Sequence, residues 1–294
     1  MSVALARRLI ERQFPELAPA RVEPLGAGWD NSAFHVNARL VFRFPRRTIA
    51  VELLAAESRL LPALAPALPL AVPVPRFLGR PEEEFPWPFA GYAWLEGQTA
   101  CRAALSGDAR RRAAAPLGAF VAALHAFPVA EARRLGAPDD VHERLSPARR
   151  RPQAHAWVEA IAAAGVEVDA AALHRAIEAP LPAAPTLPHA LVHGDLYARH
   201  VLVDADGRPC GVIDWGDVHV GAPALDLALG HLLLPPDARA EFLAAYGRPV
   251  PAEDWALARF RALYSALAVV AYGLDVDDRP LREEGTRALG WLTG

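Results

Sequence analysis

The sequence predicts an α+β chain of two packed lobes: a small antiparallel sheet with one helix, followed by a larger, mainly helical lobe. Its 294 residues exceed a typical single core and correspond to about two domains. Residues 40–44 (LVFRF) alternate as a strand does, whereas residues 109–124 and 153–179 are alanine-rich and favour helices. We therefore expect lobes of residues 1–94 and 95–294.

The N-terminal segment predicts a helix. Residues 4–10 are amphipathic and charged, and they lack the apolar core and small-residue cleavage site of a secretory signal. No stretch is expected to span a bilayer, since residues 225–234 are apolar but short. Two cysteines give neither metal-ligand spacing nor a disulfide framework. We expect a cytoplasmic protein that does not bind membranes, as a monomer or homodimer.

The net charge of −3 argues against a general nucleic-acid binder, which needs a basic surplus for phosphate contacts. Two arginine runs, residues 110–112 and 149–151, border helix-like or proline-containing sequence without interleaved aromatic residues. We expect both runs to form solvated faces.

The next elements are a glycine turn, a strand and a helix. Gly26 and Gly28 allow a close turn before the strand of residues 40–44, in which Arg43 faces away from both phenylalanines. Five leucines between residues 53 and 64 form a helical stripe that includes Glu57, with Glu52 roughly 140° around the helix. A buried carboxylate needs a cation, and the chain contains no lysine, which favours a pair of Glu57 with Arg43.

A second group of strands frames the most polar segment of the chain. The apolar runs 191–192, 201–203 and 211–213 predict strands, and residues 204–207 (DADG) supply the turn of a hairpin that ends at Asp214. This hairpin brings Asp195, His200 and Asp214 together. A structural turn with surface acids is the alternative, and it explains one aspartate more easily than three ionisable groups between apolar strands.

These three side chains suit phosphoryl transfer, which needs a group to position the attacking hydroxyl, ligands for Mg²⁺ and cations for the triphosphate. Asp195 fits the first role as the acceptor of the hydroxyl proton. Asp214 is a hard oxygen ligand for Mg²⁺, and we expect His200 to be the second residue on the metal side.

Residues 193–215 (HGDLYARHVLVDADGRPCGVIDW) resemble the aminoglycoside phosphotransferase and choline kinase-like family, distant relatives of protein kinases. The resemblance implies a protein kinase-like two-lobed fold, Asp195 as catalytic base and Asp214 as metal ligand. Most members carry asparagine where His200 stands, but the macrolide phosphotransferases look similar here, with histidine in this position. Since Mg²⁺ prefers oxygen, occupancy of a second metal site stays open.

The resemblance also implies a nucleotide site in the N-terminal lobe, with ATP or GTP as phosphoryl donor and Mg²⁺ as cofactor. Arg43, within F-R-F-P-R, replaces the usual strand lysine, and the segment of residues 89–97 joins the lobes where adenine meets the backbone. The expected nucleotide-binding residues are Gly28, Asn31, Ser32, Arg43, Glu57, Ala93 and Leu95.

Three further expectations concern the C-terminal lobe. His125 is expected to pack or cap a helix, and Asp226 to hold the catalytic loop by hydrogen bonds. Acidic residues near the C-terminus would suit a cationic acceptor if they line its pocket. These acids are Asp275, Asp277, Asp278, Glu283 and Glu284.

The predicted function is transfer of the γ-phosphate of ATP or GTP to a hydroxyl of an aminoglycoside-, macrolide- or amino-alcohol-like acceptor. Two alternatives remain: a catalytically silent nucleotide-binding module, for which His200 is the only support, and a metal-dependent hydrolase. The hydrolase requires one metal to be collected by His189, His193, Asp195, His200 and Asp214.

Overall fold

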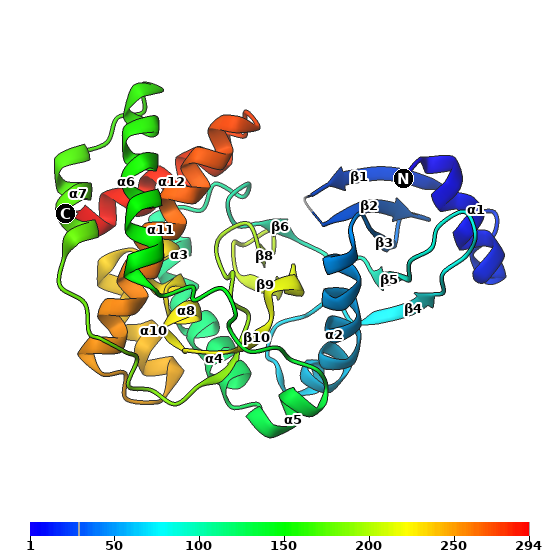
Figure 1. The fold of residues 1–294 in the computed structure, drawn as a ribbon, viewed down its shortest axis with the longest axis horizontal. Helices are drawn as coiled ribbons and strands as arrows, with labels where there is room; N and C mark the ends of the chain where they lie inside the picture. The colour runs from blue at the N-terminus through cyan, green and yellow to red at the C-terminus, as the bar shows by residue number, and fades with distance from the viewer. Residues whose placement is uncertain (29, 294) are drawn as a thin grey trace.

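The computed structural model describes residues 1–28 and 30–293 and has two lobes side by side (Figure 1). The N-terminal lobe holds an antiparallel sheet in the order β1-β2-β3-β5-β4. Its elements are α1 (Val3–Gln13), β1 (Val22–Ala27), β2 (Asn31–Val36), β3 (Leu40–Pro45), α2 (Thr48–Leu64), β4 (Pro75–Gly79) and β5 (Phe89–Ala93). The predicted N-terminal helix is thus confirmed as α1.

The two faces of this sheet are covered differently. Phe42 and Phe44 are fully buried and share a core with Leu9 and Ile10 of α1. Because side chains alternate along a strand, Arg43 lies on the opposite face, as predicted.

Helix α2 covers the Arg43 face of the sheet and also belongs to the core of the larger lobe. Its Leu54 packs with Ala90 and Tyr92 of β5. Farther along, Leu60 and Leu61 are fully buried in the hydrophobic cluster of the C-terminal lobe. The helix is therefore held between the lobes, beside the hairpin of β8 and β9 described below (Figure 1).

The chain passes between the lobes after β5. The Trp94 N–H donates to the carbonyl of Arg39, which keeps this residue attached to the sheet. Strand β6 (Gln98–Thr99) pairs with the larger lobe through β8. The expected boundary between residues 94 and 95 falls in this connection and stays a prediction.

Helices make up most of the C-terminal lobe, and the predicted α+β architecture is confirmed. The alanine-rich stretches fold as two pairs of helices, because Pro116 is tolerated in a first helical turn and Gly165, at φ +79°, follows a helix end. The helices are α3 (Gly107–Arg112), α4 (Ala114–His125), α5 (Val129–Arg134), α6 (Pro147–Ala163), α7 (Ala170–Glu178), α8 (Ala224–Leu227), α9 (Leu229–Leu232), α10 (Arg239–Tyr246), α11 (Ala252–Asp275) and α12 (Arg279–Thr293).

Helix α11 is long and apolar enough to cross a membrane by length and composition, in contrast to the expectation from the sequence. However, 61% of its apolar window is buried inside the protein. It packs against α6, α8 and α12, which is the position of a core helix.

The predicted hairpin is confirmed and lies at the inner edge of the larger lobe. Strands β8 (Val201–Val203) and β9 (Pro209–Val212) pair antiparallel, and the turn between them contains Gly207 at φ +74°. Strand β7 (Ala190–Val192) pairs with β10 (His219–Gly221) instead. The polar segment therefore runs from the end of β7 into β8, and Asp214 follows β9.

The first arginine run is not the solvated face that we expected. The guanidinium of Arg110 is buried and makes two hydrogen bonds of 2.6 Å with the carboxylate of Glu284. This pair joins α3 to α12 across the core, whereas Arg111 and Arg112 are exposed as predicted.

Candidate active site

The loop after β7 is held in shape by a buried carboxylate. Asp226 accepts hydrogen bonds from the backbone N–H groups of His193 (2.7 Å) and Gly194 (2.9 Å), and its carboxylate lies 3.3 Å from Nε2 of His125. Burial raises the pKa of Asp226, but these hydrogen bonds and the neighbouring histidines outweigh it and lower the pKa overall. The structural roles expected for Asp226 and His125 are confirmed.

Gly194 lets this loop approach the segment after β9. Its φ is +83°, and a Cβ there would lie 2.6 Å from the carbonyl oxygen of Asp217. Only glycine fits both constraints. The tight approach places Asp195 next to the end of the β8–β9 hairpin.

Asp195, His200 and Asp214 converge as predicted. Nδ1 of His200 is 2.8 Å from the carbonyl oxygen of Asp195 and 3.7 Å from its carboxylate, and Nε2 is 3.3 Å from the carboxylate of Asp214. Asp214 has left-handed backbone angles (φ 63°, ψ 68°), which aspartate tolerates better than most residues. The left-handed turn ends β9 and presents the Asp214 carboxylate beside the imidazole.

The contact of His200 with Asp214 fits a bound cation. The Nδ1 hydrogen is used by the Asp195 carbonyl, so a neutral imidazole directs the Nε2 lone pair at the carboxylate oxygen. Two lone pairs at 3.3 Å need a cation or a proton between them. Two adjacent ligands of an octahedral Mg²⁺, each at about 2.1 Å, are about 3 Å apart. The donor atoms present therefore suit one metal ion.

Arg43 connects this cluster to the N-terminal lobe. Its Nη1 makes hydrogen bonds of 3.2 and 3.1 Å with the two oxygens of Glu57, and its Nη2 lies 3.7 Å from Asp214. Burial lowers the pKa of Arg43, but Glu57 and Asp214 outweigh this effect and raise it. Burial dominates at Glu57 and raises the pKa of its carboxyl despite the cation. The predicted pair is thus present, and the exposed Glu52 takes no part in it.

The glycine loop lies at the tip of the β1–β2 hairpin, and Trp29 within it is outside the described residues. The N–H of Gly28 donates to the carbonyl of Asn31, and the glycine is exposed. The Asn31 side-chain oxygen is buried without a hydrogen-bond partner in the part of the chain that the structure describes. It lies on the same sheet face as Arg43.

The expected side-chain contact of Ser32 with phosphate does not fit the structure. Ser32 is buried and pairs across the strands with Phe44, so its side chain shares the face that packs against α1. Ser32 belongs to strand β2, and side chains alternate along a strand, so Ser32 faces away from Asn31 and Arg43.

Ala93 and Leu95, the expected adenine contacts, are half-buried at the connection between the lobes. Trp94 between them donates its N–H to Arg39, and its ring lies 4.8 Å from that of His35. The structure therefore anchors the residue between them while both flanking residues stay partly accessible.

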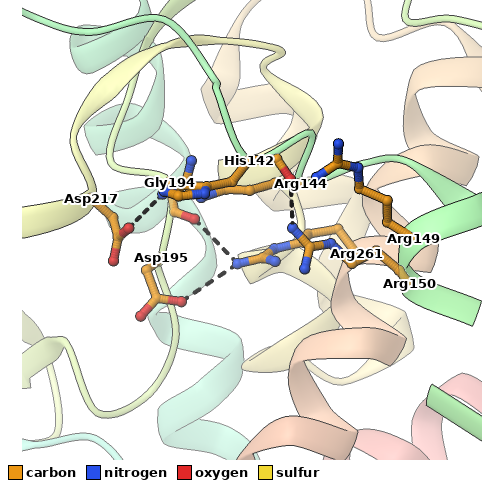
Figure 2. A pocket seen from close by; sticks show the side chains of 8 residues that line it. All are labelled: His142, Arg144, Arg149, Arg150, Gly194, Asp195, Asp217 and Arg261. Atoms are coloured by element: carbon orange, nitrogen blue, oxygen red, sulfur yellow. Dashed lines mark hydrogen bonds and ion pairs between the residues drawn. The ribbon is translucent and has the colours of Figure 1, made fainter. Parts of the chain in front are cut away.

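A polar cavity of about 380 Å³ opens on the other side of Asp195 (Figure 2). Arg261 of α11 was missed in the sequence and reaches it from below the loop, 3.2 Å from the carbonyl of Gly194 and 3.5 Å from the Asp195 carboxylate. An arginine within a largely apolar helix was the available signal, although Arg259 in the same helix carries the same signal. The cavity is lined by His142, Arg144, Arg149, Arg150, Gly194, Asp195, Asp217 and Arg261.

Two predictions about this region need correction. The arginine run at 149–151 is only in part the solvated face that we expected: Arg149 is exposed, but Arg150 is half-buried and both line the cavity. The C-terminal acids do not line it, and four of them are held in ion pairs: Asp277 with Arg282, Asp278 with Arg102, Glu283 with Arg279, and Glu284 with Arg110.

The metal set required for a hydrolase is not assembled. His189 is exposed at the start of β7, and His193 uses Nε2 to contact the carbonyl of Ile213 at 3.1 Å. Burial lowers the pKa of His193 and keeps it neutral. Within residues 1–28 and 30–293, no three histidine, cysteine or acidic side chains form a metal-binding group.

Comparisons with known proteins agree with this geometry. A family model described as the phosphotransferase enzyme family matches residues 21–263. Uncharacterized protein YcbJ of Bacillus subtilis (strain 168) is 46% identical over 39 residues, 13% of either chain. Viomycin phosphotransferase of Streptomyces vinaceus is 51% identical over 53 residues, 17% of this chain and 18% of its own. The chain thus aligns with less than a fifth of each of these curated relatives.

Solved structures match over nearly the whole chain. The GDP and kanamycin complex of APH(2")-IIia has a TM-score of 0.69 at 26% identity, covering 98% of both chains. The apoenzyme of macrolide 2'-phosphotransferase MphH from Brachybacterium faecium has a TM-score of 0.58 at 26% identity, covering 98% of this chain and 97% of its own. These similarities and the lobes described above confirm the protein kinase-like fold.

Proposed function

Because the chain belongs to the phosphotransferase enzyme family, we propose that it transfers the γ-phosphate of ATP or GTP to a hydroxyl of a small molecule. The observation that carries this proposal is the convergence of Asp195, His200 and Asp214 next to the Arg43–Glu57 pair. The cluster combines a proton acceptor (Asp195), ligands for a metal (Asp214 and His200) and a positively charged side chain (Arg43). Phosphoryl transfer requires these three kinds of group.

The proposed chemistry assigns each proton and bond. Asp195 accepts the proton of the acceptor hydroxyl, whose oxygen forms a bond to the γ-phosphorus. The bond from that phosphorus to the β–γ bridging oxygen breaks, which releases a nucleoside diphosphate and leaves a phosphate monoester. Asp214 and His200 would hold Mg²⁺, which would neutralise charge on the phosphate oxygens. Arg43 supplies a second positive charge to them.

The donor site is proposed along the sheet face that carries Arg43. In this proposal Gly28 and Asn31, at the hairpin tip, would face the phosphates, and the half-buried Ala93 and Leu95 would offer their backbone to adenine or guanine. The solved relatives include complexes with GDP and with ATP, which supports a nucleotide at this place. Both nucleotides are therefore retained as donors.

The first acceptors to test follow from the resemblance: aminoglycosides, macrolides and amino alcohols. The experiment incubates purified protein and Mg²⁺ with ATP or GTP and each acceptor, and mass spectrometry detects the gain of one phosphoryl group. We expect transfer by the wild type and none above background by Asp195→Ala. Nucleotide binding without transfer to any member of a broad panel would instead establish a silent nucleotide-binding module.

A further inference from the structure

We propose that the acceptor of this enzyme is an anion, a hydroxylated small molecule whose carboxylate or phosphate is bound by Arg150 and Arg261. This inference rests on the proposed phosphotransferase function and revises the cationic acceptor that the sequence predicted. It starts from the cavity beside Asp195, which contains four arginines (Figure 2).

The position of the cavity assigns it to the acceptor. Asp195 and Gly194 form part of its wall, so a hydroxyl inside it can reach the proton acceptor. Arg43, Glu57 and Asp214, which define the nucleotide side, are not among its lining residues. The cavity and the nucleotide therefore lie on different sides of Asp195.

Two of the arginines are already neutralised by carboxylates. Arg144 pairs with Asp140 at 2.9 Å and also with Asp217. Arg149 pairs with Glu143 at 2.8 Å. These pairs account for Asp217, and the other acidic residue of the lining, Asp195, lies 3.5 Å from Arg261.

Arg150 and Arg261 share a single carboxylate between them. Arg150 donates to the carbonyl of His142 (2.9 Å) and the hydroxyl of Tyr264 (3.3 Å), both uncharged, and its Nε is buried without a hydrogen-bond partner in the described part of the chain. Arg261 has one carboxylate nearby, that of Asp195 at 3.5 Å. Two guanidinium groups beside one carboxylate leave a net charge of about +1 in this part of the cavity.

Burial makes this excess charge costly. Arg261 is 8% exposed, and its burial together with the nearby arginines lowers the pKa of the guanidinium although Asp195 acts in the opposite direction. A buried cation without a full counterion is stabilised by an incoming anion. Arginine also matches the planar geometry of carboxylate and phosphate by paired hydrogen bonds.

The same lining does not suit a cation. An amino sugar in this cavity would meet four arginines, and the acids that could compensate for its charge are held elsewhere in ion pairs. An anionic group near Arg150, by contrast, leaves Asp195 free to face a hydroxyl of the same molecule.

The first experiment compares acceptors with closely related frameworks and different charge: glucose, glucosamine, gluconate and glucose 6-phosphate, within a wider panel of hydroxy acids, sugar phosphates, amino alcohols and aminoglycosides. Transfer is measured with Mg²⁺ and ATP or GTP. We expect the highest kcat/KM among anionic acceptors, and the carboxylate and phosphate members distinguish the two acid groups. A highest kcat/KM for a cationic or neutral acceptor overturns the inference and leaves the proposed function standing.

The second experiment changes the charge of the cavity. Arg150→Glu is expected to raise the KM for an anionic acceptor by about tenfold or more, with the KM for nucleotide little changed. Arg112→Glu is the matched control, since this exposed arginine on α3 lies outside the cavity and makes the same change in net charge. Equal KM values in wild type and Arg150→Glu contradict the inference.

Binding is measured separately from catalysis, so that failure of the proposed function can be recognised. Calorimetry with inorganic phosphate as the probe, without nucleotide, should give a signal in wild type and Arg112→Glu that is lost in Arg150→Glu. Phosphate binding without any transfer supports the anion site and removes the kinase activity. Absence of phosphate binding, or an affinity for phosphate that is the same in wild type and Arg150→Glu, overturns the anion site.

Discussion

The two sides of Asp195 differ in how their charges are balanced. On the nucleotide side, Arg43 is paired with Glu57 and lies near Asp214, so positive and negative groups alternate from one lobe to the other. On the acceptor side, Arg261 lies 3.5 Å from Asp195, whereas Arg150 donates only to uncharged groups among the residues that the structure describes. The arginine on the nucleotide side is therefore neutralised within the protein, whereas the arginines on the acceptor side retain an excess positive charge, which is the basis of the proposed anionic acceptor.

The two sides differ because one binds a group common to all nucleoside triphosphates, whereas the other binds an acceptor that varies between enzymes. Every nucleoside triphosphate has the same phosphates, so the groups that face it are fixed by a few residues in local sequence patterns. Acceptors vary, and their site is built from α6, α11 and the segment before α6, which are far apart along the chain. Variants on the two sides should therefore affect different measurements.

The largest effect is expected at the residue shared by both sides. Asp195→Ala should lower turnover by about 10² to 10⁴, the usual contribution of a positioned acid or base. Affinity for nucleotide should change little, since Asp195 does not contact the Arg43–Glu57 pair. Steady-state kinetics and a nucleotide titration measure both quantities, and wild-type turnover in the variant would exclude Asp195 from the reaction.

A second variant tests whether Arg43 stabilises the fold by neutralising the buried carboxylate of Glu57. Arg43→Met leaves Glu57, 1% exposed, without its cation and should lower the free energy of unfolding by about 3 kcal/mol. Denaturant titration measures this change. Adding Glu57→Gln to Arg43→Met should recover most of the stability but not nucleotide affinity, and a double variant as unstable as the single one would show that the cost has another origin.

The metal side is tested best with Asp214→Asn. Asparagine keeps the left-handed turn, whereas alanine at φ 63° adds strain of about 1 kcal/mol that would confuse the result. We expect affinity for the Mg²⁺–nucleotide complex to fall at least about tenfold, since even the partners of metal ligands contribute this much. Calorimetry with and without Mg²⁺ checks the expectation, and equal affinity in wild type and variant would contradict it.

The smallest effect is on stability at a position outside both sides. Burial lowers the pKa of His231 to about 3, and its ring packs 4.1 Å from that of Trp255. The unfolded chain therefore binds a proton below about pH 6.5 that the folded protein does not, so stability falls as the pH falls. Between pH 6.5 and 5.5 this histidine should contribute a loss of about 1 kcal/mol.

His231→Phe removes this titration. Its free energy of unfolding, measured by denaturant titration at both pH values, should fall less than that of the wild type by the same amount. Equal falls in the two proteins would mean that His231 is protonated in the folded state.

The nucleotide side could be predicted because its signals are local. A carboxylate in an apolar stripe, an arginine between two phenylalanines and a DADG turn each act over a few residues, and all three placements agree with the structure. The prediction for Ser32 is wrong because the local sequence does not show that β2 begins at Asn31, and alternation along that strand puts the two side chains on opposite faces.

The acceptor side could not be predicted in this way. Arg110 and Arg150 stand in similar arginine runs, yet one is buried against Glu284 and the other lines the cavity. The difference depends on which distant helix each one meets, and a run of charge contains no information about that. The acidic residues near the C-terminus were expected at the acceptor for the same reason: the sequence does not show which arginines they pair with.

Helix α2 has one consequence for how the enzyme is controlled. In protein kinases, activation depends on moving the helix that carries the glutamate partner of the strand cation. Here Leu60 and Leu61 of that helix are buried in the core of the larger lobe. Moving it would expose apolar surface, so the burial of these leucines favours the position in which Glu57 stays beside Arg43.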